Sequence, residues 1–199
     1  DHALEAYRRL GEETGLALCA SHGLQSVEEF QAMREAGVTR YHANLETSRR
    51  NFPNICTTHT YEDKLENIRR AQAAGLEVCS GGILGMGETW EDRLDMALDL
   101  SELGVVSIPL NLLTPIPGTP LEEAEPLTEG EVFRSVAIFR LLNPTARIRM
   151  AAGRRRFAGG GRKLFRCGAN AAITGDMLTT TGTGIAGDRA MFAQLGYEI

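Results

Sequence analysis

The sequence lacks any apolar run close to the roughly 18 residues that cross a bilayer, and no charged-then-apolar leader opens it. We therefore expect a cytoplasmic protein without a membrane partner. It also lacks the basic excess that phosphate backbones attract, because its formal net charge is −5. We accordingly expect no nucleic-acid partner.

The four cysteines form no CxxC pair, which excludes a zinc knuckle or a thioredoxin motif. Without a secretory leader they are free thiols, serving either as packing residues or as ligands of a soft metal. We assign Cys56 and Cys167 to packing. A hydrophobic fraction of 43% suits a single globular domain over residues 1–199. The basic, glycine-containing stretch from Arg154 to Arg166 is interpreted as a solvated flexible loop rather than a polyanion site.

Short apolar runs alternate with amphipathic helical stretches, the pattern of a parallel sheet with crossover helices. A helix is expected over Ala3–Thr14, and capping boxes at Ser26, Thr60, Thr89 and Thr128 predict further helix starts. Glycines 37, 75 and 104 stand where helices should stop. The six expected strands are Leu16–Ser21, Val38–Ala43, Leu76–Ser80, Val105–Leu112, Arg147–Ala151 and Ala169–Thr174.

Six strand–helix units in succession favour an incomplete (β/α)8 TIM-type barrel, with six of the eight βα units present. An open doubly wound sheet is the alternative, but its first strand should lead into a Gly-rich phosphate turn, and the segment Cys19–Gly23 is not one. The chain opens inside a helix and without Met, so we expect a barrel domain that has lost its first two units to truncation.

Three unusual residues fall on alternate strands, where one interior layer of a barrel would bring them together. They are Cys19, Cys79 and Arg149. A single buried cysteine is ordinarily a small hydrophobe. Two thiols and a guanidinium in one cavity are costly without a compensating ligand, and a thiolate-bound iron–sulfur cluster would supply it.

Polar and glycine-rich segments follow the strands. Alternation puts Asn44 and Glu46 on one side, where they could bind ribose hydroxyls, although a turn with a helix cap explains them equally well. The glycine-rich turn from Gly81 to Thr89 would let the backbone approach a ligand, with Ile83 offering an apolar face to a purine. Further polar groups at the same rim, which could also serve only as caps, are Asn111, Thr179 and Thr180.

Several long motifs, spread over nearly the whole chain, resemble the biotin synthase signature. They are residues 41–48, 51–61, 78–83, 85–89, 107–111, 115–121, 147–154, 168–170 and 175–180. The resemblance implies a radical S-adenosylmethionine (SAM) barrel that inserts sulfur into dethiobiotin, the last step of biotin biosynthesis. In that family a [4Fe–4S] cluster bound by a CxxxCxxC motif reduces SAM to a 5′-deoxyadenosyl radical. A [2Fe–2S] cluster held by three cysteines and one arginine donates the sulfur.

Carried over by position, the resemblance gives each candidate residue a role. Cys19, Cys79 and Arg149 would bind the [2Fe–2S] cluster. SAM would contact Asn44, Glu46 and Ile83, and dethiobiotin would contact Asn44 and Asn111 through its ureido ring and Thr179 and Thr180 through its carboxylate. The resemblance further implies a homodimer and an electron donor such as a flavodoxin or ferredoxin.

The sequence departs from the family pattern in two places. The CxxxCxxC motif and the third cluster cysteine are absent, so the isolated chain should be inactive. Ala43 stands where the family often has His. Two alternatives stay open: a related radical SAM enzyme, such as a hydrogenase-maturation or methylornithine-forming one, and a non-catalytic ligand-binding remnant.

Overall fold

The computed structural model describes residues 2–176 and 182–198. Its strands form one parallel sheet in the order β1-β2-β3-β5-β6-β7, with β4 paired to β5. This order confirms the six strand positions predicted from the sequence, although most strands are shorter than expected. The strands are β1 (Leu18–Ala20), β2 (Val38–His42), β3 (Glu77–Cys79), β4 (Gly82–Leu84), β5 (Ser107–Leu112), β6 (Arg147–Met150) and β7 (Ala171–Ala172).

Strands β3 and β4 occupy a single strand position, because both pair with β5. The prediction of a glycine-rich turn from Gly81 was therefore wrong in part, since the turn begins only after Leu84. The two glycines instead permit close backbone packing: a Cβ on Gly81 would lie 2.0 Å from the carbonyl oxygen of Pro109. A Cβ on Gly82 would lie 2.5 Å from the carbonyl oxygen of Glu46.

The helices begin where the capping boxes predicted. Ser26, Thr60, Thr89 and Thr128 each accept a hydrogen bond from the N3 amide, and the N3 carboxylate accepts one in return. Such caps satisfy amide groups that the first helical turn leaves without partners. The helices are α1 (His2–Thr14), α2 (Val27–Glu35), α3 (Phe52–Ile55), α4 (Tyr61–Ala73), α5 (Trp90–Glu102), α6 (Glu129–Leu142), the 3₁₀ turn η1 (Arg154–Arg156), α7 (Ala158–Arg166) and α8 (Ile185–Gln194).

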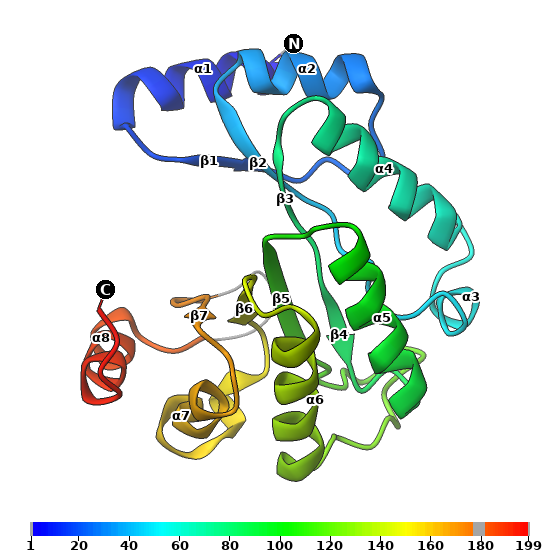
Figure 1. The fold of residues 1–199 in the computed structure, drawn as a ribbon, viewed down its shortest axis with the longest axis vertical. Helices are drawn as coiled ribbons and strands as arrows, with labels where there is room; N and C mark the ends of the chain where they lie inside the picture. The colour runs from blue at the N-terminus through cyan, green and yellow to red at the C-terminus, as the bar shows by residue number, and fades with distance from the viewer. Residues whose placement is uncertain (1, 177–181, 199) are drawn as a thin grey trace.

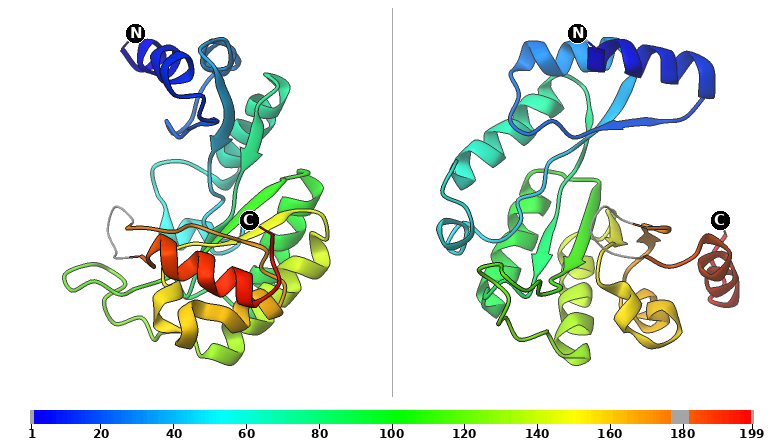
Figure 2. Two further views of the ribbon diagram at one scale, coloured as in Figure 1. Left: turned by 90° about the vertical axis from the view of Figure 1, so that its left-hand side faces the viewer. Right: turned by 180° about the vertical axis from the view of Figure 1, so that it is seen from behind.

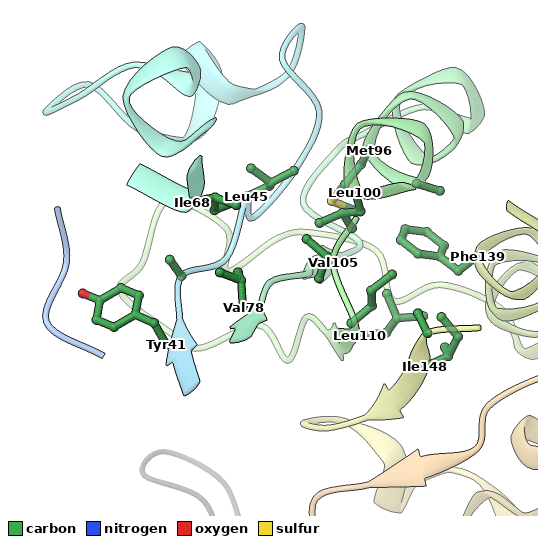
Figure 3. Close-up of a cluster of buried hydrophobic side chains, with 14 of the residues drawn as sticks. Tyr41, Leu45, Ile68, Val78, Met96, Leu100, Val105, Leu110, Phe139 and Ile148 are labelled. Carbon is green, nitrogen blue, oxygen red and sulfur yellow. The ribbon is translucent and has the colours of Figure 1, made fainter. Parts of the chain in front are cut away.

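The sheet curls into a half-barrel with helices α2, α4, α5 and α6 along its outer side (Figures 1 and 2). This curvature confirms the incomplete barrel and excludes the flat doubly wound sheet. Helices α1 and α8 lie on the sides of β1 and β7, the two outermost strands of the sheet (Figure 1). The main core lies between the sheet and these helices, and Figure 3 shows its members Tyr41, Leu45, Ile68, Val78, Met96, Leu100, Val105, Leu110, Phe139 and Ile148.

The basic stretch is not a flexible loop, so that prediction was wrong. It forms η1 and α7, and Arg154 is buried in an ion pair with Asp188, in which Nη1 lies 2.9 Å from Oδ1. Arg154 also donates to the carbonyl oxygen of Gly160. Sequence reasoning missed this pair because Asp188 lies 34 residues further along the chain.

Cys56 and Cys167 are half-buried and pack against the core, as predicted. All four cysteines are free of disulfide bonds. Within the part of the chain that the structure describes, no helix is long and apolar enough to cross a membrane.

Candidate iron–sulfur and ligand site

Cys19, Cys79 and Arg149 lie on β1, β3 and β6, which are separated from one another by β2 and by β5. Successive side chains of a strand point to opposite faces of the sheet. Ile148 and Met150 belong to the core beneath the helices, so Arg149 between them points to the concave inner face. By the same alternation Cys79, which follows the core residue Val78, points inward.

The two thiols share one electrostatic environment. Partial desolvation raises the pKa of Cys19, its interaction with Cys79 raises it further, and the charges of Arg40 and Arg149 lower it. The Sγ of Cys79 donates a hydrogen bond to Oγ of Ser107 at 3.4 Å. Cys79 is 8% exposed, whereas Cys19 is solvent-exposed. The inner face therefore holds both thiols close to positive charge.

Arg149 has a buried Nε atom without a hydrogen-bond partner. A buried donor in that state carries a desolvation cost, which an anionic ligand at this face would offset. No group of three or more His, Cys, Asp and Glu side chains is gathered for a metal ion anywhere in residues 2–176 and 182–198. Two thiols and one guanidinium thus fit part of the ligand set of a thiolate-bound cluster.

Two further inner-face residues flank the thiols and were missed by the sequence reasoning. Arg40 pairs in register with Cys19, and His42 pairs with Cys79. Burial lowers the pKa of His42, and the charges of Lys64 and Arg149 lower it further. The sequence could have indicated both residues, because positions 40, 42 and 44 are two residues apart and therefore share the face assigned to Asn44.

Asn44 and Glu46 meet at the end of β2. The Oδ1 of Asn44 accepts a hydrogen bond from the Gly81 amide at 3.1 Å, and its Nδ2 lies 3.4 Å from Oε2 of Glu46. Burial raises the pKa of Glu46, against the lowering effects of Lys64 and the Asn44 hydrogen bond. Glu46 has a φ of +72°, the one positive φ outside glycine among the described residues, so regular alternation ends there. Such strain often marks a functional position.

Asn111 and Ile83 are paired in register on β5 and β4. The Oδ1 of Asn111 accepts from the Ala152 amide at 3.2 Å, and its Nδ2 donates to the carbonyl oxygen of Gly82 at 3.4 Å. Ile83 is half-buried at the same strand end. Thr179 and Thr180 lie outside the described residues.

A buried carboxylate fixes the turn that follows β4. Glu88 accepts hydrogen bonds from the amides of Gly85 and Met86, at 2.8 and 2.7 Å, and from Nε of Arg93. Arg93 in turn stacks on Trp90, with its guanidinium carbon 4.6 Å from the ring centroid. The backbone beyond Ile83 is therefore held in one conformation.

Comparison with known proteins decides the family. A model of the radical SAM superfamily matches residues 1–100, and a model of the Biotin and Thiamin Synthesis associated domain matches residues 109–198. The chain belongs to the radical SAM superfamily. Membership in the radical SAM superfamily implies SAM and an iron–sulfur cluster as cofactors.

Two relatives match along practically the whole chain. A biotin synthase from Clostridium beijerinckii is 58% identical over 100% of this chain and 63% of its own length. A biotin synthase from Alkaliphilus metalliredigens is 59% identical over 99% of this chain and 62% of its own length. The chain thus spans somewhat less than two thirds of the length of these radical SAM relatives.

The fold is also that of a solved structure. The crystal structure of methylornithine synthase superposes with a TM-score of 0.82, over 99% of this chain and 63% of that one, at 19% sequence identity. At this identity the likeness concerns the fold alone, and it supports the half-barrel described above.

Proposed function

We propose that this chain forms part of a biotin synthase, in which radical SAM chemistry inserts sulfur into dethiobiotin to form biotin. The observation that carries the proposal is the inner face of the half-barrel, where two thiols and an arginine with an unpartnered Nε face the same side. The identity of 58–59% to proteins named biotin synthase supports it.

Cys19 and Cys79 would bind iron of a [2Fe–2S] cluster as thiolates, and Arg149 would complete the set through its guanidinium. The clusters and SAM, when bound, supply the radical chemistry and the sulfur atom. The remaining [2Fe–2S] cysteine and the CxxxCxxC ligands of a [4Fe–4S] cluster have no counterpart in these 199 residues. For that reason the isolated chain is expected to be inactive as a sulfurtransferase.

The rim residues would hold the two small molecules. The carboxylate of Glu46 and the amide of Asn44 suit ribose hydroxyls and the amino-acid end of SAM, while Ile83 offers an apolar surface to adenine. Asn44 and Asn111 each carry a donor and an acceptor, which match the ureido ring of dethiobiotin. Thr179 and Thr180 are proposed for its carboxylate on sequence resemblance alone.

The proposal extends to the biological setting. We infer a cytoplasmic homodimer supplied with electrons by a flavodoxin or ferredoxin, and a single barrel domain over residues 1–199. The sheet continues from β3 and β4 to β5 across the boundary between the two family models, which favours one domain.

The test uses the complete protein, purified without oxygen and reconstituted with iron and sulfide. Cys79→Ala is expected to abolish the [2Fe–2S] absorption and biotin formation while SAM cleavage persists. Cys167→Ala is the matched control, because Cys167 packs against the core and lies on α7's C-terminal cap rather than on an inner-face strand. Retention of the [2Fe–2S] absorption and of biotin formation by Cys79→Ala would contradict the assignment.

Two other functions are compatible with the half-barrel. A methylornithine-forming or hydrogenase-maturation enzyme shares the barrel, but the identity to methylornithine synthase is 19% against 58% to a biotin synthase. A non-catalytic remnant would bind SAM or dethiobiotin without turning them over. Failure of the reconstituted complete protein to cleave SAM would favour the remnant.

A further inference from the structure

Arg40 and Glu77 extend the inner face next to the two thiols. Arg40 pairs in register with Cys19 on one side and with Glu77 on the other. Glu77 stands two residues before Cys79 on β3, and residues two apart on a strand share a face. A thiol on β1, a guanidinium on β2 and a carboxylate on β3 therefore lie side by side in one row on the inner face.

The two charged side chains form an ion pair. Nη2 of Arg40 lies 2.7 Å from Oε2 of Glu77, and Nε lies 3.3 Å from the same oxygen. The side chain of Arg40 is 29% exposed and that of Glu77 is 55% exposed. Ion pairs this exposed contribute little to stability, so a purely structural role explains the arrangement poorly.

The charge of Arg40 acts on both thiols. Its guanidinium interacts electrostatically with Cys19 and with Cys79, in addition to Glu77. Glu77 also interacts with Arg147, whose strand neighbour in register is Ser107, the hydrogen-bond partner of Cys79. The carboxylate thus interacts with two cations and forms an ion pair with Arg40, the one whose charge acts on the thiols.

We propose that the charge of Arg40 raises the reduction potential of the iron–sulfur cluster bound by Cys19, Cys79 and Arg149, and that Glu77 is the positioning residue that holds Arg40 in place. The inference rests on the proposed function, because it requires that cluster. Reduction adds an electron to an already anionic cluster, and a nearby cation stabilises the more negative state. Net charge and hydrogen bonding at the sulfurs are the protein's means of setting such potentials.

The experiment compares three variants in the complete reconstituted protein: Arg40→Gln, Arg40→Lys and Glu77→Gln. Iron and sulfide contents are measured first. The midpoint potential is then determined by a redox titration that follows the visible absorption and electron paramagnetic resonance of the [2Fe–2S] cluster. Arg69→Gln, an exposed arginine on α4, is the control.

Arg40→Gln is expected to lower the midpoint potential. Glu77→Gln is expected to raise it, because the glutamine oxygen still accepts the hydrogen bonds of Arg40 while the opposing negative charge is lost. Arg40→Lys and Arg69→Gln should stay near the unmodified protein. Loss of the cluster in Arg40→Gln with its retention in Arg40→Lys also supports a role for the charge. Unchanged potentials in Arg40→Gln and Glu77→Gln at full cluster content would overturn the proposal. So would shifts of the same sign, or cluster loss in both Arg40 variants with the potential of Glu77→Gln unchanged. Absence of a [2Fe–2S] cluster from the unmodified protein would instead refute the proposed function.

Discussion

Arg93 and Glu88 form an ion pair inside the protein, with Nε 2.8 Å from Oε1 and side-chain exposures of 4% and 1%. The same carboxylate accepts the amide hydrogen bonds of Gly85 and Met86. One side chain therefore fixes both the start of α5 and the turn that leads away from Ile83. This makes Glu88 a positioning residue for the rim of the proposed site.

Replacing Glu88 by Gln should destabilise the protein strongly. Removing one partner of a buried ion pair leaves the other charge unpaired and costs about 3 kcal/mol or more. The free energy of unfolding in urea measures this loss. Glu102→Gln, an exposed change at the C-terminal end of α5, should alter stability by no more than about 0.5 kcal/mol. Equal losses in the free energy of unfolding of the two variants would show that the buried ion pair contributes no more to stability than an exposed glutamate does.

Gly81→Ala and Gly130→Ala should have opposite effects. The new Cβ at position 81 would meet the carbonyl oxygen of Pro109 at 2.0 Å, so the strands must separate, at a cost of about 3 kcal/mol. At position 130, in α6, a Cβ meets nothing within 4 Å and alanine improves helix propensity by about 0.5 kcal/mol. Thermal and urea unfolding of both variants would test this. A stable Gly81→Ala protein would contradict the close approach.

Asp92 should make the protein sensitive to acid. Burial alone would raise the pKa of Asp92, but hydrogen bonds from Ser48, Thr89 and Arg50 outweigh burial and hold the pKa well below its usual 3.8. A carboxylate with a depressed pKa stabilises the fold above its unfolded-state pKa, and this contribution is lost as pH falls through the folded-state pKa.

Asp92→Asn should accordingly lower the free energy of unfolding at neutral pH by about 2 kcal/mol, the usual range for hydrogen bonds to a charged group. The gap between variant and unmodified protein should shrink as pH falls below about 4, where the unfolded carboxyl protonates. Urea unfolding at neutral pH and at pH values below 4 measures the gap. A gap that stayed constant with pH would show that ionisation of Asp92 is not its source.

Cys56 should react faster than Cys19 with iodoacetamide when iron is absent. A hydrogen bond from Thr58 lowers the pKa of Cys56, with a smaller contribution from His59, whereas burial raises the pKa of Cys19. The thiolate is the nucleophile, so the thiol with the lowered pKa is labelled first. Mass spectrometry of labelled peptides gives the two rates. Thr58→Val should slow Cys56 a few-fold and leave Cys167 unchanged.

Local rules predicted the fold well, because its main determinants are close in sequence. The capping boxes join residues three apart, and each predicted helix start was confirmed. The interruption between β3 and β4 was not predictable, because it depends on contacts of Gly81 with Pro109 and of Gly82 with Glu46, far along the chain. The buried pair of Arg154 and Asp188 escaped for the same reason.

The layer rule for barrels, applied to alternate strands, indicated Cys19, Cys79 and Arg149, and side-chain alternation along a strand indicated Asn44 and Glu46. The same alternation would also have indicated Arg40 and His42, which lie four and two residues before Asn44. What alternation cannot give is the state of each polar atom. That Asn44 is engaged by the Gly81 amide, while Nε of Arg149 has no partner, follows only from three-dimensional contacts.

The half-barrel has two sheet edges, since β1 pairs only with β2 and β7 only with β6 among the described strands. The outer backbone amides and carbonyls of such edge strands are templates for pairing with further extended polypeptide. In concentrated solution, edge-to-edge addition of one molecule to another would therefore make this 199-residue chain prone to aggregate.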